Sequence, residues 1–224
     1  MSKAVGLDGG TMFLVGSQET EEGSVKYTSQ RNCFLTVEGG EEVESMLTES
    51  GAKLINVGGK TSILGEDAIV FSNMLSSFGV AGATLKRPMK DGVLNSQEEA
   101  SAISVLTALV EGVVGRGNGV DDVCAFSKPS NPLNSDKNNT FHVAMFQRIL
   151  SGLGYSPVVL NEALAAIYAE NPTMGDRPMS GIGISFGSGQ VNVCMAVRGM
   201  PVVEFSLVGS GDEIDRQVSV LCGK

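Results

Sequence analysis

The chain has 224 residues, of which 42% are hydrophobic and 5% aromatic, and its formal net charge at pH 7 is −9. The apolar content is enough to build a core, and the 29 glycines favour an α/β protein with many tight turns over a disordered chain. The acidic balance excludes nucleic-acid binding through a basic surface and makes an anionic membrane surface an unfavourable partner.

The spacing of the cysteines and the lengths of the apolar runs indicate in which cellular compartment the protein is expected. The four cysteines form no C-x-x-C pair, and Cys124 and Cys194 lie within apolar runs, so we expect buried thiols rather than metal ligands or disulfides. No signal peptide, no apolar run of about 18 residues and no amphipathic or basic N-terminal segment is recognisable. A cytoplasmic protein without a membrane anchor is therefore expected.

The first part of the chain predicts a meander of strands interrupted by helices. Strands are predicted over 3–8, 11–16, 25–28, 32–37, 53–57 and 60–64. An acidic helix is expected over 41–50 and a second helix over 65–76. A proline-broken, extended segment follows over 85–93.

The second part alternates helices with strands. The clearest helix is predicted over 96–114, capped by Asn95 or Ser96 with Glu98 or Glu99 three residues on. Further helices are predicted over 140–153, 161–171 and 212–221, and further strands over 121–127, 156–160, 179–185, 190–198 and 201–208. This order predicts a mixed sheet with helices on its faces.

The turn between the first two strands reads Asp8-Gly9-Gly10-Thr11. Its glycines leave backbone N–H groups unshielded, and a phosphate can sit against such groups. Asp8 ends the first strand, where its carboxylate can meet a divalent cation on the phosphates. The same pattern also suits an ordinary hairpin, so its interpretation depends on partner motifs further along the chain.

Three later segments supply such partners. Asn161 and Glu162 stand at the carboxyl end of a predicted strand, where ligands of α/β sheets gather. A second glycine-rich hairpin turn spans 185–190, and the turn over 207–215 opens the last helix and offers another anion seat. The glycines before Lys60 do not form a P-loop, because the first glycine of that motif is missing. His142, the only histidine, has no partner pattern and is expected to be an ordinary helix residue.

This ordered set of motifs resembles the actin-like ATPase superfamily, which includes actins, heat-shock chaperone ATPases and sugar kinases. The stretches 65–68 (Gly-Glu-Asp-Ala) and 86–93 (Lys-Arg-Pro-Met-Lys-Asp-Gly-Val) are most similar to MreB-type bacterial actins. The resemblance implies an α/β, ribonuclease-H-like mixed sheet with flanking helices. We expect the first half of an actin-like fold over 1–178 and an incomplete second half, with its opening strands, over 179–224.

The resemblance also implies roles for individual residues. ATP and Mg²⁺ would bind between the two hairpins, Asp8 would approach the Mg²⁺, and Glu162 would orient or polarise the attacking water, because phosphoryl transfer depends mainly on positioning and charge neutralisation. The residues expected to contact the nucleotide are Asp8, Gly9, Gly10, Thr11, Met12, Ser185, Gly187, Ser188, Gly189, Gln190, Gly209, Gly211 and Asp212.

The second hairpin departs from the family pattern Asp-x-Gly-Gly-Gly-Thr. Ser185 replaces a carboxylate, and Ser188 and Gln190 add bulk where the backbone approaches phosphate. The leading hypothesis is an MreB-like cytoskeletal ATPase, converting ATP and water to ADP and phosphate, that self-associates into filaments or needs a completing partner chain. A non-hydrolysing actin-like scaffold and a fragment of a chaperone-type ATPase remain as alternatives.

Overall fold

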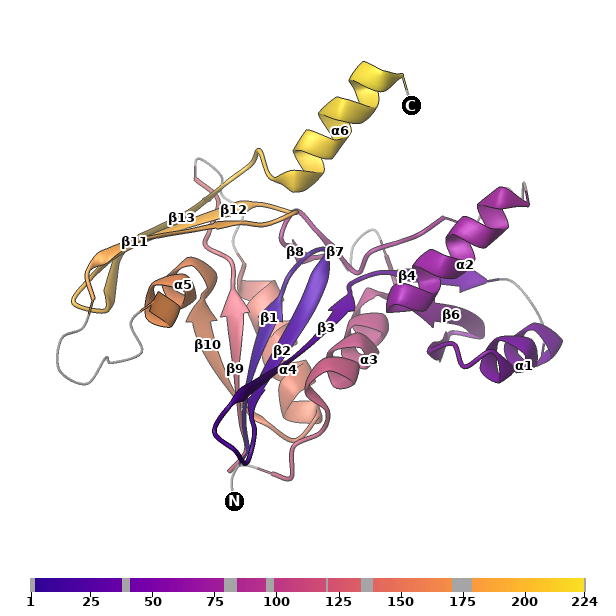
Figure 1. Cartoon of the computed structure of the whole chain (residues 1–224), viewed down its shortest axis with the longest axis horizontal. Helices are drawn as coiled ribbons and strands as arrows, with labels where there is room; N and C mark the ends of the chain where they lie inside the picture. The colour runs from indigo at the N-terminus through magenta and orange to yellow at the C-terminus, as the bar shows by residue number, and fades with distance from the viewer. Residues whose placement is uncertain are drawn as a thin grey trace.

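The computed structural model describes residues 3–37, 41–78, 84–95, 99–119, 121–133, 139–170 and 179–223 (Figure 1). The strands are β1 (Ala4–Gly9), β2 (Phe13–Glu19), β3 (Val25–Arg31), β4 (Phe34–Val37), β5 (Leu54–Val57), β6 (Lys60–Leu64), β7 (Met89–Lys90), β8 (Val93–Leu94), β9 (Val123–Lys128), β10 (Ser156–Asn161), β11 (Gly181–Phe186), β12 (Val191–Val197) and β13 (Met200–Leu207). The helices are α1 (Glu41–Glu49), α2 (Gly65–Ser77), α3 (Ala102–Val114), α4 (Thr140–Gly152), α5 (Glu162–Glu170) and α6 (Gly211–Cys222).

The main sheet has the strand order β10-β9-β1-β2-β3. Short turns make β1, β2 and β3 antiparallel, whereas β9 and β10 run parallel to β1 because helices connect them. Helix α3 packs against β2 and β3, and α4 packs against β10. The predicted mixed α/β sheet with flanking helices is confirmed.

Two three-stranded sheets flank the main one, and β7 pairs with β8 in a separate hairpin. The sheet β4-β6-β5 lies beside α1 and α2, and the sheet β11-β12-β13 lies across the end of the main sheet where β9 and β10 finish (Figure 1). Helix α5 covers β11 and β12, whereas none of the described α6 residues is buried. Within the described residues, no helix is long and apolar enough to cross a membrane.

The principal core lies between the main sheet and helices α3 and α4. Its largest fully buried side chains include Leu14, Leu106, Phe126 and Phe146, and the rings of the two phenylalanines stack with centroids 5.7 Å apart. The thiols of Cys124 and Cys194 are buried, as predicted from their apolar surroundings. Burial raises the pKa of the Cys124 thiol to about 12, so it stays protonated and unreactive.

The predicted start of the helix over 96–114 is wrong, because α3 begins only at Ala102. The carboxylate of Glu99 accepts hydrogen bonds from the backbone N–H of Ser101 at 3.3 Å and from its hydroxyl at 2.6 Å. This local pairing forms a turn in place of the first helical turn. The predicted cap Ser96 lies outside the described residues.

Helix α5 crosses β11 so closely that only glycine fits at position 183. A Cβ atom there would overlap the carbonyl oxygen of Ala163 and lie 2.9 Å from Cγ1 of Ile167. Gly183→Ala is therefore expected to lower the free energy of unfolding by about 2 kcal/mol, the usual cost of overpacking. Gly181→Ala, two residues earlier where an added Cβ meets nothing within 4 Å, is the control for chemical denaturation. Equal stabilities of the two variants would contradict the close crossing.

Candidate functional site

The first hairpin loop, residues 10–12, presents its donors outward. Buried Asn32 holds the loop from behind, since its side-chain amide donates to the Gly10 carbonyl at 2.8 Å and its backbone N–H donates to the Met12 carbonyl at 2.9 Å. A Cβ on Gly10 would lie 2.6 Å from the Phe13 carbonyl oxygen, so the tight loop requires glycine there. Among the described residues, no acceptor is found for the backbone N–H groups of the loop. Such a set of donors suits an anion.

Asp8 lies at the end of β1 with its side chain exposed, and one neighbour orients it. The hydroxyl of Ser127 on β9 donates to Oδ1 of Asp8 at 2.6 Å and accepts the backbone N–H of Gly9 at 3.1 Å. Oδ2 of Asp8 has no partner in the described part of the chain. The carboxylate therefore keeps one oxygen for a ligand.

Glu162 is the first residue of α5, and its carboxylate joins two sheets. Oε1 accepts the hydroxyl of Ser185 on β11 at 2.5 Å, and Oε2 accepts the side-chain amide of Asn192 on β12 at 2.9 Å. Burial raises the pKa of the Glu162 carboxyl, the Ser185 hydrogen bond opposes this shift, and the negative charge of Asp8 adds to it. Asp8 and Glu162, paired in the sequence analysis, thus lie close enough to interact.

The second hairpin loop, residues 187–190, meets the first loop. The N–H of Gly187 donates to the Gln190 carbonyl at 3.1 Å, and no acceptor is found for the N–H groups of 188–190 within the described residues. A Cβ on Gly189 would overlap the hydroxyl of Thr11 and the backbone of Gly92. The two loops therefore contact each other directly, Gly189 against Thr11, and the β7–β8 turn meets them at Gly92.

The MreB-like stretch singled out in the sequence lies between the two loops. Asp91 and Gly92 form the turn of the β7–β8 hairpin at positive φ, and the N–H of Gly92 donates to Oγ1 of Thr11 at 3.2 Å. Gln190 packs on Gly92 and is only 9% exposed, with its Nε2 unpaired. Sequence reasoning assigned no role to this turn, because its contacts join residues far apart in the chain.

The third glycine turn supports the second hairpin from behind. The N–H groups of Gly211 and Asp212 donate to the carbonyls of Gly187 at 3.1 Å and Ser188 at 2.9 Å, so these two donors at the start of α6 are engaged. The Asp212 carboxylate pairs with the Arg87 guanidinium at 2.8 Å and 3.0 Å. Gly209 stands at φ +94°, a conformation that favours glycine.

A buried polar chain connects the main sheet to the second one. The side-chain carbonyl of Asn192 accepts the backbone N–H of Ser130 at 2.8 Å, and the Ser130 hydroxyl accepts the side-chain amide of Asn161 at 2.8 Å. Asn161 also accepts the N–H of Leu164 at 3.0 Å and so caps the start of α5. Asn161 carries a recognisable capping signal in sequence, whereas Ser130 and Asn192 show none, because their partners lie tens of residues away.

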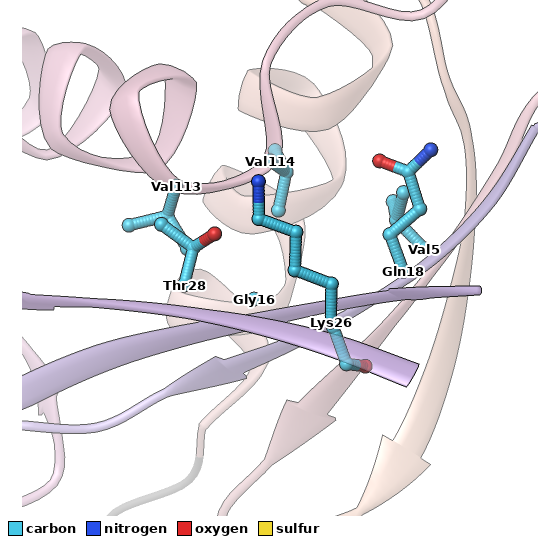
Figure 2. A pocket seen from close by; sticks show the side chains of 8 residues that line it. Val5, Gly16, Gln18, Lys26, Thr28, Val113 and Val114 are labelled. Carbon is cyan, nitrogen blue, oxygen red and sulfur yellow. The ribbon is translucent and has the colours of Figure 1, made fainter. Parts of the chain in front are cut away.

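Two cavities lie away from the hairpins. Figure 2 shows one of about 80 Å³ at the far end of β1 and β2, against the end of α3, lined by Val5, Gly16, Ser17, Gln18, Lys26, Thr28, Val113 and Val114. The other, of about 290 Å³, lies between α5 and β11. The first is too small for a nucleotide, and neither includes Asp8 or Glu162.

His142 lies on α4, as predicted, and is buried under the first hairpin. Its ring lies 4.7 Å from that of Phe146, which in turn touches Gly9. Its Nδ1 accepts the N–H of Leu94 at 3.2 Å, and burial lowers the pKa of the imidazole to about 4. Within the described residues, no group of three or more His, Cys, Asp or Glu side chains is arranged to hold a metal ion.

This arrangement, a mixed five-stranded sheet and a second sheet that each end in a glycine hairpin, defines an actin-like fold. The MamK double helical filament shares this fold at 16% identity and a TM-score of 0.65, and the match covers 99% of this chain and 59% of that one. An MreB protein of Spiroplasma citri bound to AMPPNP shares it at 14% identity and a TM-score of 0.62, with 99% of this chain and 56% of that one covered. The AlfA filament from a B. subtilis plasmid shares it at 12% identity and a TM-score of 0.54, with 99% of this chain and 79% of that one covered. The chain thus spans under three fifths of the length of the first two.

The sequence profile of the Volactin family matches residues 3–224, and the chain belongs to this family. None of the curated proteins compared with it matches.

Two buried groups predict opposite effects of pH on stability. The folded pKa of His142 lies below its unfolded value, so the unfolded chain takes up a proton first as the pH falls below about 6.5, and by about pH 4 the free energy of unfolding is expected to be lower by about 3 kcal/mol. The folded pKa of Glu162 is raised, so its contribution to stability is present at acid pH and lost as the pH rises through that pKa.

Denaturant titrations between pH 4 and 8 test both effects. Glu162→Gln removes one titration and keeps a side chain of similar size, so its stability should rise more steeply with pH than that of the unmodified chain. Identical slopes for the two proteins would show that burial of Glu162 has no effect on its titration in the folded state.

Proposed function

We propose that the chain binds a nucleoside triphosphate with Mg²⁺ between the loops 10–12 and 187–190, and that the nucleotide controls self-assembly into filaments. One observation carries the proposal: two glycine loops from different sheets, each with unpaired backbone N–H groups, meet beside the interacting carboxylates of Asp8 and Glu162. Oriented N–H groups bind phosphate oxygens in many nucleotide sites.

The donor set suits Mg²⁺ as well as phosphate. Mg²⁺ usually keeps several waters and binds through one or two carboxylates together with phosphate oxygens, so a cluster of three protein ligands is not required. The free Oδ2 of Asp8 supplies one such oxygen at the mouth of the first loop. Bound there, Mg²⁺ would neutralise charge on the phosphates.

Glu162 is the candidate to orient the attacking water. Its raised pKa brings the carboxylate closer to the range of an effective general base at neutral pH. Each of its oxygens already accepts one hydrogen bond and keeps a second lone pair, so Glu162 is able to accept from a water while Ser185 and Asn192 hold it.

Self-association is supported by the similar proteins and by the surface. MamK and AlfA are described as filaments, and the chain has their fold. Large apolar side chains on β11, β13 and α6 are exposed, including Phe186 at 81%, Met200 at 71% and Leu221 at 86%. Large exposed apolar side chains favour association with a second copy or with a completing chain.

A non-hydrolysing scaffold is the second candidate, and the chemistry around Glu162 favours it. Both contacts to its carboxylate come from the neutral side chains of Ser185 and Asn192, and Ser185 stands where the family pattern has an aspartate. The site therefore has one carboxylate fewer to hold Mg²⁺ or the attacking water. Binding without turnover would follow.

Glu162→Ala is expected to leave Mg²⁺-ATP binding within about threefold and to reduce turnover by about 10²–10³-fold, as removal of a general base does. Calorimetry and phosphate release measure the two quantities, and Glu170→Ala at the exposed end of the same helix is the control. Sedimentation with ATP and with ADP tests assembly. No detectable Mg²⁺-ATP binding would overturn the proposal, and turnover unaffected by Glu162→Ala would remove the catalytic role.

Ser185→Asp separates the two candidates. The new carboxylate would stand at hydrogen-bonding distance from Glu162, so without Mg²⁺ the free energy of unfolding at pH 8 is expected to fall by about 2 kcal/mol. Ser185→Asn keeps a neutral donor and is the control.

If the scaffold candidate is right, Ser185→Asp combined with Gln190→Thr creates little ATPase activity. Turnover by the unmodified chain at actin-like rates would exclude the scaffold candidate.

A further inference from the structure

We propose that Ser127 is a positioning residue, which orients the Asp8 carboxylate for the cation that accompanies the nucleotide. This inference rests on the proposed function and deepens it. It starts from the two hydrogen bonds of the Ser127 hydroxyl, which connect β9 to the end of β1.

The parallel pairing of β1 with β9 places Ser127 beside Asp8. Leu7 pairs with Phe126, and both of these side chains are buried in the core. Because side chains alternate along a strand, the next residues, Asp8 and Ser127, both point to the other face of the sheet. Their contact is thus a consequence of strand register and not of a chance surface rotamer.

The direction of the Ser127 hydroxyl is determined by its second contact. The Gly9 N–H donates to Oγ at 3.1 Å, which occupies a lone pair of the hydroxyl and directs its proton to Oδ1 of Asp8 at 2.6 Å. The carboxylate plane is thereby held, and Oδ2 remains open. The backbone N–H of Gly9 is thereby paired, so the N–H groups of the first loop without an acceptor among the described residues begin at residue 10.

This geometry has a functional consequence. An exposed aspartate without a partner samples several rotamers and loses that freedom when it binds a cation. Ser127 selects one rotamer in advance, as preorganised sites do. If Ser127 served only to satisfy the Gly9 N–H, its loss would change stability without any selective effect on the cation.

The experiment compares nucleotide affinity with and without the cation. In Ser127→Ala, the affinity for ATP with Mg²⁺ is expected to fall about tenfold, whereas the affinity for ATP in EDTA is expected to change by less than about twofold. Ser127→Thr keeps the hydroxyl and should restore the Mg²⁺-dependent part. Thermal unfolding shows whether each variant is folded. If Ser127→Ala does not fold, Ser127→Cys replaces it; its thiol is a weaker donor, so an intermediate loss of Mg²⁺-dependent affinity is expected.

Ser180→Ala is the matched control, because the Ser180 hydroxyl also accepts a backbone N–H, from Arg198 at 2.9 Å, and within the described residues no contact joins it to a carboxylate. It should leave both affinities unchanged. Equal losses with and without Mg²⁺ in Ser127→Ala, or no loss, would overturn the positioning role. ATP binding by the unmodified chain without any dependence on Mg²⁺ would overturn this inference alone, and no ATP binding at all would overturn the proposed function with it.

Discussion

The structure depends on buried polar contacts at the junction of two sheets, where the Glu162 carboxylate at the start of α5 meets two strands of the second sheet. A half-buried carboxylate is costly unless donors replace the water it loses, and Ser185 and Asn192 supply one donor to each oxygen. Because Glu162 opens α5 directly after β10, these bonds and the Asn192–Ser130–Asn161 chain together hold the second sheet at the end of the first. The second hairpin is then carried to a place opposite the first.

A second set of contacts depends on that placement. Once the hairpins face each other, the absence of side chains at Gly92 and Gly189 lets three backbone segments meet at Thr11. The ion pair between Arg87 and Asp212 ties the start of α6 to the same point. The stretch 86–93 thus packs against both hairpins where they meet, and the tight Asp-Gly turn lets its backbone approach Thr11 and Gly189.

The candidate site of this Volactin-family chain differs in charge from the pattern Asp-x-Gly-Gly-Gly-Thr, because Ser185 stands in place of the aspartate. Neutral Ser185 and Asn192 contact the Glu162 carboxylate, whose pKa the negative charge of Asp8 raises further. Under the proposed function, charge balance at the site would come from the nucleotide and its cation. This charge distribution supports the proposal in which nucleotide binding, more than rapid turnover, controls assembly.

Short-range patterns in the sequence determined a large part of the protein: the glycine hairpins, the start of α5 at Asn161 and Glu162, the buried thiols and the mixed α/β sheet. Each depends on residues within a few positions of one another, where periodicity and turn chemistry operate. The start of α3 was mispredicted even so, because the side chain of Glu99 pairs with Ser101 instead of opening the helix.

The tertiary structure alone decided which side chains surround these motifs. Asn32, Ser127 and Asn192 reach the site only through strand register and the packing of one sheet on another. A hydrogen bond between residues 119 positions apart, such as that from Ser127 to Asp8, leaves no local trace in the sequence. The sequence therefore identified the two glycine hairpins and their neighbouring carboxylates, and only the fold determined how each carboxylate is held beside the loops.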